Sequence, residues 1–279
     1  HRPRLILDAQ GGANRVVTRW VKGDSLSALD LRRAVKGCEG AIYLHSTTVP
    51  KSSNDDPAFD FHSNGLSALT FLGVVAELDI ARCIFISSGG TVYGPPRYLP
   101  INEDHPTNPG VSYGVTKLAI EHHFKLLSHT GNTKPLIFRV SNPYGALQRL
   151  DGGQGVIGHF LSRALKGEQV QIYGDGQIVR DYLYVDDLAE AFERALVYEG
   201  DEIIMNISSG VGTSLVELLD AIEAVTDCRI KRQYLPARNF DVPVNILSNN
   251  RAKAELGWAP KTDLRRGLHL TARALRHRG

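Results

Sequence analysis

Tyr113 and Lys117 are the two residues of this chain whose types and spacing most directly suggest catalytic chemistry. They lie in the stretch VSYGVTKLAIEHHFK, from Val111 to Lys125. Four residues apart on a helix, the two side chains share one face and lie about one turn apart. A free tyrosine has a pKa of about 10, so a fixed ammonium group that favours the phenolate would make Tyr113 a usable base near neutral pH. The spacing also arises by chance, and a tyrosine beside a solvated lysine is the alternative.

The composition indicates a folded protein with a large core. The chain has 279 residues, of which 42% are hydrophobic and 22% charged, enough for one large domain or two smaller ones. A net charge of +2 comes from scattered residues, so no nucleic-acid partner is expected. No apolar run approaches the roughly 18 residues that span a bilayer, so no membrane partner is expected either.

The three cysteines indicate the compartment. Cys38, Cys83 and Cys228 lie far apart and form no CxxC pair. Neither a disulfide framework nor a zinc site is therefore indicated, and a cytoplasmic location fits best. The adjacent His122 and His123 point about 100° apart on a helix, so no metal site is expected there.

Several further motifs accompany the tyrosine and lysine. They are SSGGTVYG from Ser87 to Gly94, NPYG at 142 to 145, YGDGQIVRDYLYVDD at 173 to 187 and ELGWAP at 255 to 260. With YGVTK at 113 to 117, their order and spacing resemble the extended short-chain dehydrogenase/reductase family. Within that family the chain is most similar to the NAD-dependent sugar-nucleotide epimerases and dehydratases, nearest to the UDP-glucose 4-epimerases. The resemblance covers nearly the whole chain.

The resemblance implies an α/β fold: a Rossmann-like, doubly wound parallel sheet with a smaller α+β substrate domain. We assign residues 1–145 and 178–206 to the NAD-binding domain, and residues 146–177 and 207–279 to the sugar-nucleotide domain. A Rossmann unit needs a strand, a glycine-rich turn and a helix before its first acidic strand end, and none precedes Asp8. We therefore interpret the chain as lacking the first βα unit.

Apolar runs and turn residues predict the elements that position the motifs. Arg180 to Tyr182 are expected to return the chain to the sheet. Strands are expected at Leu5 to Leu7, Val16 to Val21, Ala41 to His45, Ile84 to Ile86 and Leu136 to Val140, and helices at Ser27 to Val35, Ala58 to Leu78, Val156 to Lys166 and after Pro109.

The resemblance places NAD along the carboxyl ends of these strands. Asp8 would bind the adenosine ribose, and Asp24 would lie beside the adenine ring. Asn64 would lie near the nicotinamide ribose, together with Tyr113 and Lys117. The cofactor-contacting stretch at the end of the Ala41 strand contains Leu44, His45 and Ser46, where the family usually has small residues at the last two positions.

The resemblance also places substrate contacts along the chain. Arginine forks suit phosphate oxygens, so Arg180 and Arg238 are expected on the substrate diphosphate, although isolated arginines are more often surface ion pairs. Four further residues are expected around the sugar and uridine: Asn142 at the sugar, Gln171 and Tyr173 at the uracil ring, and Asp241 at the uridine ribose.

A hydroxyl donor should accompany the tyrosine, and here the chain departs from the family. The family places Ser or Thr four residues before the tyrosine of Val-Tyr-Gly, whereas this chain has Gly89. Thr91 is expected to substitute because it should share the side of Gly89 on an extended strand, with Ser88 the second candidate.

The helix that carries Tyr113 has two apolar stripes. One contains Val115, Leu118, Ala119 and Leu126, and the other Ile120, Phe124 and Leu127. A helix that is apolar on two sides should be covered on two sides, so we expect its own sheet on one side and a second subunit of a homodimer on the other. Burial within a single chain is the alternative.

Together these residues predict NAD-dependent 4-epimerisation of a UDP-sugar through a 4-keto intermediate, with Tyr113 as base and Lys117 supporting it. A related sugar-nucleotide dehydratase, decarboxylase or reductase remains an alternative. Dehydration is disfavoured because Gly89 and Gly90 stand where a dehydratase carries acidic residues. A non-catalytic nucleotide-binding homologue is the third possibility.

Overall fold

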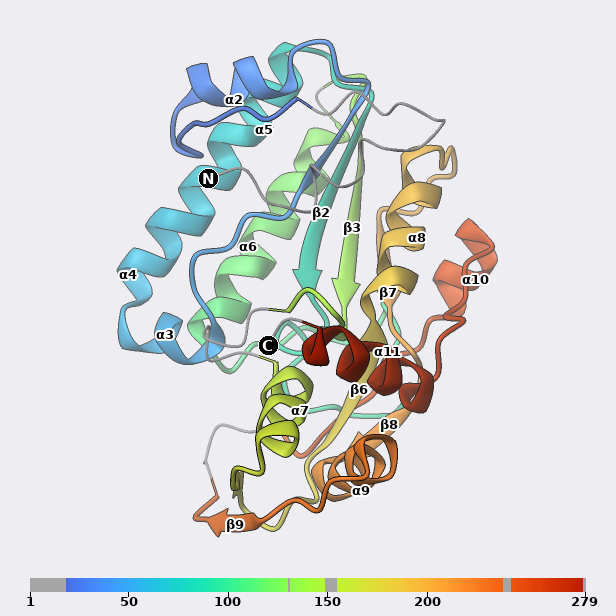
Figure 1. Ribbon diagram of the computed structural model, residues 1–279. Coiled ribbons are helices and arrows are strands. Elements are labelled where there is room, and N and C mark those ends of the chain that lie inside the picture. Colours follow the sequence, from blue (N-terminus) through green and yellow to red (C-terminus); the bar gives the residue numbers. More distant parts are fainter. Residues whose placement is uncertain (1–18, 130, 149–154, 238–241, 278–279) are drawn as a thin grey trace.

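A four-stranded parallel sheet organises the upper half of the molecule. The computed structural model describes residues 19–129, 131–148, 155–237 and 242–277. The strands are β1 (Gly40–Tyr43), β2 (Arg82–Ser88), β3 (Lys134–Val140) and β7 (Ile204–Ile207), in the order β1-β2-β3-β7. Their carboxyl ends point toward the lower half (Figure 1). The predicted α/β fold with a parallel sheet is confirmed.

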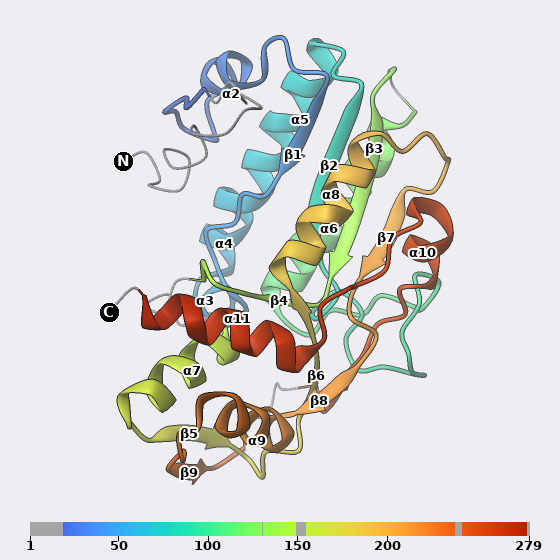
Figure 2. The same ribbon diagram turned by 45° about the vertical axis from the view of Figure 1, so that its right-hand side comes forward.

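Apolar residues cover both faces of this sheet. On β2, Phe85 joins the core formed with α2 (Ala28–Val35), α5 (Ser67–Glu77) and α6 (Ser112–Leu127). Its neighbour Ile84 points to the opposite face, where α8 (Val185–Leu196) and α10 (Asn250–Leu256) lie. Successive side chains of a strand alternate between faces, so a continuous apolar run fills both layers. Figure 2 shows α8 in front of the sheet and α6 behind it.

The lower half has its own sheets and core. One sheet has the order β10 (Val244–Asn245), β6 (Val179–Tyr184) and β4 (Asn142–Tyr144), and β8 (Gly212–Ser214) pairs antiparallel with β6. A second sheet pairs β5 (Val170–Tyr173) with β9 (Arg232–Leu235). The helices α7 (Val156–Lys166), α9 (Leu215–Thr226) and α11 (Leu264–Arg276) contribute to the third core. All lie below the carboxyl edge of the first sheet (Figure 1).

Two expectations about strands are wrong. Arg180 to Tyr182 lie in β6, whose partners are β4, β8 and β10, and β7 is the strand that returns to the first sheet. Residues 19–21, the described part of the strand expected at Val16 to Val21, form no strand. An apolar run predicts a strand, but its partner depends on the course of the whole chain. The strand expected at Leu5 to Leu7 lies outside the described residues.

The helix expected from Ala58 to Leu78 is interrupted. It consists of α4 (Pro57–Asp60), the π-helical segment η2 (Phe61–Leu66) and α5, with the short α3 (Pro50–Asp55) before it. Asp56 caps the start by accepting a hydrogen bond from the Phe59 amide at 2.9 Å. Inserted π turns often occur at functional sites, and this one contains Asn64.

Candidate active site at the carboxyl edge of the sheet

The first turn of α6 is anchored by α3. No side chain at the N-cap Val111 binds the free amides of α6. Instead, Asn54 Oδ1 accepts from the Ser112 amide at 2.9 Å, and Ser53 Oγ accepts from the Tyr113 amide at 3.0 Å. These bonds satisfy helix amides that otherwise lack partners and fix the backbone that carries Tyr113.

Tyr113 and Lys117 come together as their spacing predicts. The Lys117 Nζ lies 5.4 Å from the centre of the Tyr113 ring. Burial raises the pKa of the Tyr113 phenol, the charge of Asp60 adds to this, and interaction with the Ser46 hydroxyl opposes it. The phenolate is therefore a strong base that depends on a neighbouring positive charge.

Lys117 supplies that charge from a buried position. Its side chain is only 3% exposed, and Nζ donates to the Ile86 carbonyl at 3.1 Å. Burial lowers the pKa of the ammonium to about 8, although the charges of Asp60 and Glu121 act in the opposite direction. The group thus remains mainly charged at neutral pH and loses its proton in mildly alkaline solution.

Thr91 lies next to the start of α6 with an unused hydroxyl. Its Oγ1 is buried and has no hydrogen-bond partner among the described residues. A Cβ on Gly114 would lie 2.7 Å from the Thr91 carbonyl oxygen, so only glycine allows this close approach of the helix. A buried hydroxyl without a hydrogen-bond partner lowers the stability of the folded protein. The Thr91 hydroxyl is therefore a donor that a ligand could use.

Gly89 cannot serve the role that the family gives to this position. A Cβ there would lie 2.3 Å from Leu247 Cδ1 and 3.2 Å from the Val140 carbonyl oxygen. A serine or threonine at this position would require Leu247 to move, and the glycine itself has no hydroxyl group to donate. Ser88 ends β2 and is partly buried.

A row of polar groups leads from Asp24 to Tyr113. Asp24 is exposed, and the hydroxyl of the adjacent Ser25 lies 3.3 Å from His45 Nε2. Burial lowers the pKa of the His45 imidazole, so this ring is neutral at physiological pH. Ser46 follows and interacts with the Tyr113 hydroxyl.

This row fits an NAD molecule laid along the sheet edge. Leu44 is 56% exposed there, although it directly follows β1. An exposed leucine followed by the polar side chains of His45 and Ser46 suits a ligand with flat rings and a polar backbone. Asp24, Leu44, His45, Ser46, Asn64, Tyr113 and Lys117 are the described residues that would hold the cofactor.

Asp60 is a buried residue at this site that the sequence pattern did not reveal. Its carboxylate accepts from Thr48 Oγ1, from Asn64 Nδ2 at 2.9 Å, from Ser112 Oγ at 3.2 Å and from Thr116 Oγ1 at 2.7 Å. Asn64 in turn accepts from the Thr47 amide at 2.8 Å. The carboxylate therefore joins α4, η2, α6 and the loop after β1.

Glu121 and Arg139 form a second buried network that the sequence pattern missed. Arg139 donates to Glu121 from Nε at 3.1 Å and from Nη2 at 2.6 Å, and Ser87 Oγ donates to the same carboxylate at 2.5 Å. The Arg139 guanidinium lies 4.8 Å from the centre of the Tyr93 ring. The pair holds α6 against the ends of β2 and β3.

The expected substrate residues lie on the lower sheets. Asn142 on β4 donates to the Asp181 carbonyl at 2.9 Å, and Arg180 on β6 donates to the Val242 carbonyl at 2.7 Å. Gln171 and Tyr173 are on β5, with Gln171 exposed and Tyr173 partly exposed. Asp8, Arg238 and Asp241 lie outside the described residues.

Unpaired polar atoms also gather on this side of the molecule. Ser141 directly follows β3, Tyr182 lies on β6 and Asn245 on β10, and each has a buried oxygen without a partner among the described residues. Asn245 Nδ2 also donates to the Gly89 carbonyl at 3.1 Å, which brings β10 to the turn after β2. The interface between the two halves thus offers free hydroxyl and amide oxygens to a polar ligand.

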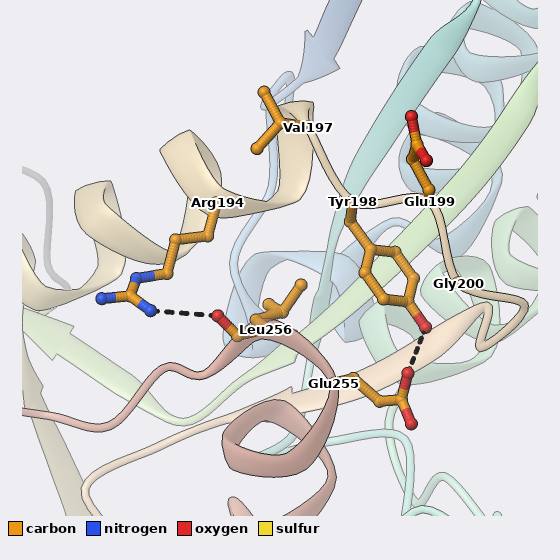
Figure 3. Close-up of a pocket in the computed structure, with 7 residues that line it drawn as sticks. All are labelled: Arg194, Val197, Tyr198, Glu199, Gly200, Glu255 and Leu256. Carbon is orange, nitrogen blue, oxygen red and sulfur yellow. Dashed lines mark hydrogen bonds between the residues drawn. The ribbon is translucent and has the colours of Figure 1, made fainter.

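A surface pocket lies between α8 and α10, on the face of the first sheet opposite α6 (Figure 3). It has a volume of about 460 Å³ and is lined by Arg194, Tyr198 and Glu255 among others. Its polar groups already pair: Tyr198 Oη donates to Glu255 at 2.6 Å, and Arg194 donates to the Leu256 carbonyl at 3.0 Å. These contacts join α8 to α10.

No described helix is long and apolar enough to cross a membrane. Within the described residues, no cluster of three His, Cys, Asp or Glu side chains has an arrangement that could hold a metal ion.

Comparisons with known proteins identify the family of this chain. The NAD dependent epimerase/dehydratase family matches residues 5–208. A UDP-glucose 4-epimerase of Mycolicibacterium smegmatis is 33% identical over 261 residues, which cover 93% of this chain and 83% of that protein. A dTDP-4-dehydro-6-deoxyglucose reductase of Escherichia coli is 36% identical over 241 residues, covering 84% and 74%. The crystal structure of the Thermotoga maritima UDP-glucose 4-epimerase with UDP-glucose is 30% identical and superposes with a TM-score of 0.90, covering 97% of this chain and 89% of that one. This chain therefore belongs to the NAD dependent epimerase/dehydratase family.

Proposed function

We propose that this protein interconverts UDP-glucose and UDP-galactose, or a closely related pair of UDP-hexoses, by inverting the sugar's fourth carbon. The observation that carries this proposal is the pairing of the Tyr113 phenol with the buried Lys117 ammonium on α6. The turn that contains Thr91, whose hydroxyl is unpaired among the described residues, packs against the start of the same helix. Two of the three relatives described above, from Mycolicibacterium smegmatis and Thermotoga maritima, are UDP-glucose 4-epimerases and support the same activity.

In this proposal each of the three groups has one task. Tyr113 removes the proton from the sugar's 4-hydroxyl group and later returns it. Lys117 stabilises the phenolate by its charge, and Thr91 donates a hydrogen bond to the reacting oxygen. Bound NAD would accept the hydrogen of the fourth carbon as hydride and give it back.

The lower half would hold the nucleotide. Asn142 would contact the sugar, Gln171 and Tyr173 the uracil ring, and Arg180 with Arg238 the diphosphate, while Asp241 would bind the ribose. We propose residues 1–145 and 178–206 as the NAD-binding domain and residues 146–177 and 207–279 as the substrate domain. Asn142 and Arg180 belong to the first of these ranges but would reach the substrate from β4 and β6, which pair in the lower sheet. Asp8 would bind the adenosine ribose.

Two further parts of the proposal concern the cellular setting. A homodimer is supported by α6, on which Val115 and Leu126 are 53% and 58% exposed while Phe124 is fully buried. A cytoplasmic location is supported by Cys38, Cys83 and Cys228, which are all free thiols.

The test is Tyr113→Phe, which keeps the ring and removes the proton acceptor. Interconversion of UDP-glucose and UDP-galactose should fall by roughly 10² to 10⁴, because general base catalysis contributes about that much. UDP-glucose binding, measured by calorimetry, should persist. Tyr98→Phe is the control, since Tyr98 is exposed and donates only to Asn102.

Two results would overturn the proposal. One is a Tyr113→Phe variant that turns over like the wild type. The other is a wild-type protein that releases a dehydrated or reduced sugar from UDP-glucose in place of the epimer, which would favour a dehydratase or a reductase.

A further inference from the structure

Asp60 holds three separate segments together at the proposed active site. It is completely buried at the end of α4, directly before the π-helical segment. One carboxylate oxygen, Oδ1, accepts from Thr48 and from Asn64, while the other, Oδ2, accepts from Ser112 and Thr116. Four donors for two oxygens is the arrangement that an ionised carboxylate requires, because it has no proton of its own to donate.

The two buried carboxylates near Lys117 differ in their partners. Glu121 is paired with Arg139 at 2.6 Å, so an adjacent cation compensates its charge. No ion pair among the described residues includes Asp60. A buried carboxylate that has only neutral donors keeps its full negative charge and acts on charged groups nearby.

Lys117 is the buried cation near Asp60 that has no carboxylate in contact. Its Nζ donates to a backbone carbonyl, that of Ile86. Thr116, which donates to Asp60, is its neighbour in the sequence, and the charge of Asp60 favours the protonated lysine. The other titratable groups that face Lys117 are Tyr113 and Glu121 on α6 and His45 after β1.

We infer that Asp60 is a positioning residue: it fixes the start of α6 against η2 and the loop after β1, and its charge keeps Lys117 an ammonium. This inference rests on the proposed roles of Tyr113 and Lys117. It assigns to Asp60 the larger share of the electrostatic stabilisation of the Lys117 ammonium, to which Glu121 also contributes. Substrate and cofactor need not touch Asp60, because it acts through its hydrogen-bonded neighbours and through the field in the site.

The test compares Asp60→Asn with Thr116→Val. The asparagine keeps the shape, and the hydroxyl groups of Ser112 and Thr116 can turn to accept from its amide. Thr116→Val removes one donor and leaves the charge. Titration of the Lys117 side chain by ¹³Cε NMR, assigned by the loss of its signal in Lys117→Arg, requires no enzymatic activity.

In Asp60→Asn we expect Lys117 to lose its proton at lower pH than in the wild type, whereas in Thr116→Val it should titrate as in the wild type. The kcat of Asp60→Asn should fall roughly three- to tenfold at pH 7.5, because fewer molecules then carry the ammonium. The ratio of its kcat to the wild-type kcat should rise as the pH is lowered. Thr116→Val should show a ratio that does not change with pH.

An unchanged Lys117 titration in Asp60→Asn would overturn the inference, as would an equal change in Thr116→Val. If Asp60→Asn does not fold, the ¹³Cγ signal of Asp60 in the wild type decides instead, because it reports whether the carboxyl group carries a proton. A protonated carboxyl group between pH 6 and pH 9 would contradict the inference. A shifted lysine titration in a protein without epimerase activity would refute the proposed function and leave the role of Asp60 intact.

Discussion

Thr91 is the residue that we propose in place of the family's usual hydroxyl donor. The turn after β2 places its hydroxyl in a buried position without a partner among the described residues, while a Cβ at Gly89 would lie only 3.2 Å from the Val140 carbonyl oxygen. The proposed donor thus lies two residues further along the chain than the family pattern would place it.

The roles of the two hydroxyl groups can be separated by substitution. Thr91→Val keeps the side-chain shape and removes the donor, and loss of one preorganised donor lowers kcat by roughly 10² to 10³. Ser88→Ala should lose clearly less. Steady-state kcat for the epimerisation is the measurement, and nearly full activity of both variants would show that neither hydroxyl group serves the reaction.

Burial of the Lys117 ammonium lowers the free energy of unfolding by an amount that depends on pH. The pKa of its ammonium is about 8 in the folded protein and 10.5 in the unfolded chain, so between these values the unfolded chain binds more protons. The cost of burying the charge is therefore fully present below pH 8 and decreases as the pH rises toward 10.5.

Lys117→Met should reveal this cost. The free energy of unfolding of the variant minus that of the wild type should be larger at pH 7 than at pH 9.5 by about 2 kcal/mol. Urea unfolding at both pH values measures it, and the difference between the two proteins cancels the titration of other groups. If this difference in the free energy of unfolding is the same at both pH values, the claim that Lys117 is buried as a cation is refuted.

Residue types and spacing were sufficient to predict that Tyr113 and Lys117 share one helix face, which the structure confirms. They could not find Asp60, because its partners Thr48 and Thr116 are 12 and 56 residues away in the sequence. Only the folded chain brings these groups together, and an aspartate before an apolar helix is otherwise a common capping residue.

Among the elements, α6 depends most on buried charge. Its inner face presents Glu121 to Arg139 of β3, with side chains 0% and 4% exposed. Breaking such a pair by removing one charge leaves the other buried and uncompensated.

Glu121→Gln should therefore lower the free energy of unfolding by roughly 3 to 5 kcal/mol. Glu77→Gln is the control, because the Arg32–Glu77 pair has a similar short distance of 2.5 Å but side chains that are 37% and 53% exposed. That change should have a much smaller effect, because solvent screens the exposed pair. Equal effects in urea unfolding would show that burial does not govern the pair.

The sequence predicted most helices and strands near the site but not the partners of each strand. The helix expected at Ser27 to Val35 is confirmed as α2, with Ser27 as its cap, because a capping residue and helical spacing are local signals. β6 was assigned to the wrong sheet, because its apolar residues fit either sheet equally well. The π-helical segment η2 was missed, since its sequence has the same apolar spacing as a regular helix.

At the scale of the whole molecule, the exposed apolar residues of α6 bear on assembly. Leu126 is 58% exposed on this helix, and on the adjoining segments Phe59 and Phe61 are 53% and 49% exposed. Such a surface suits a second copy of the chain.

Leu126→Glu should convert the proposed dimer to monomers, because a charge would be buried in the contact. Val197→Glu is the control, since Val197 is 79% exposed at the end of α8, on the other side of the sheet. Sedimentation velocity distinguishes the two species. A wild-type protein that sediments as a monomer would contradict the proposed homodimer.

The close contact between Gly114 and the Thr91 carbonyl has a consequence for the dynamics of the protein. Because a single Cβ at residue 114 would already be 2.7 Å from that oxygen, the helix start and the turn cannot separate independently without opening their shared packing. Amide hydrogen exchange should therefore report one cooperative unit, in which the amides of Thr91 and Val115 exchange with the same free energy of opening. The proposed base and donor would then become disordered together on partial unfolding, so that a molecule with only one of them in place is never appreciably populated.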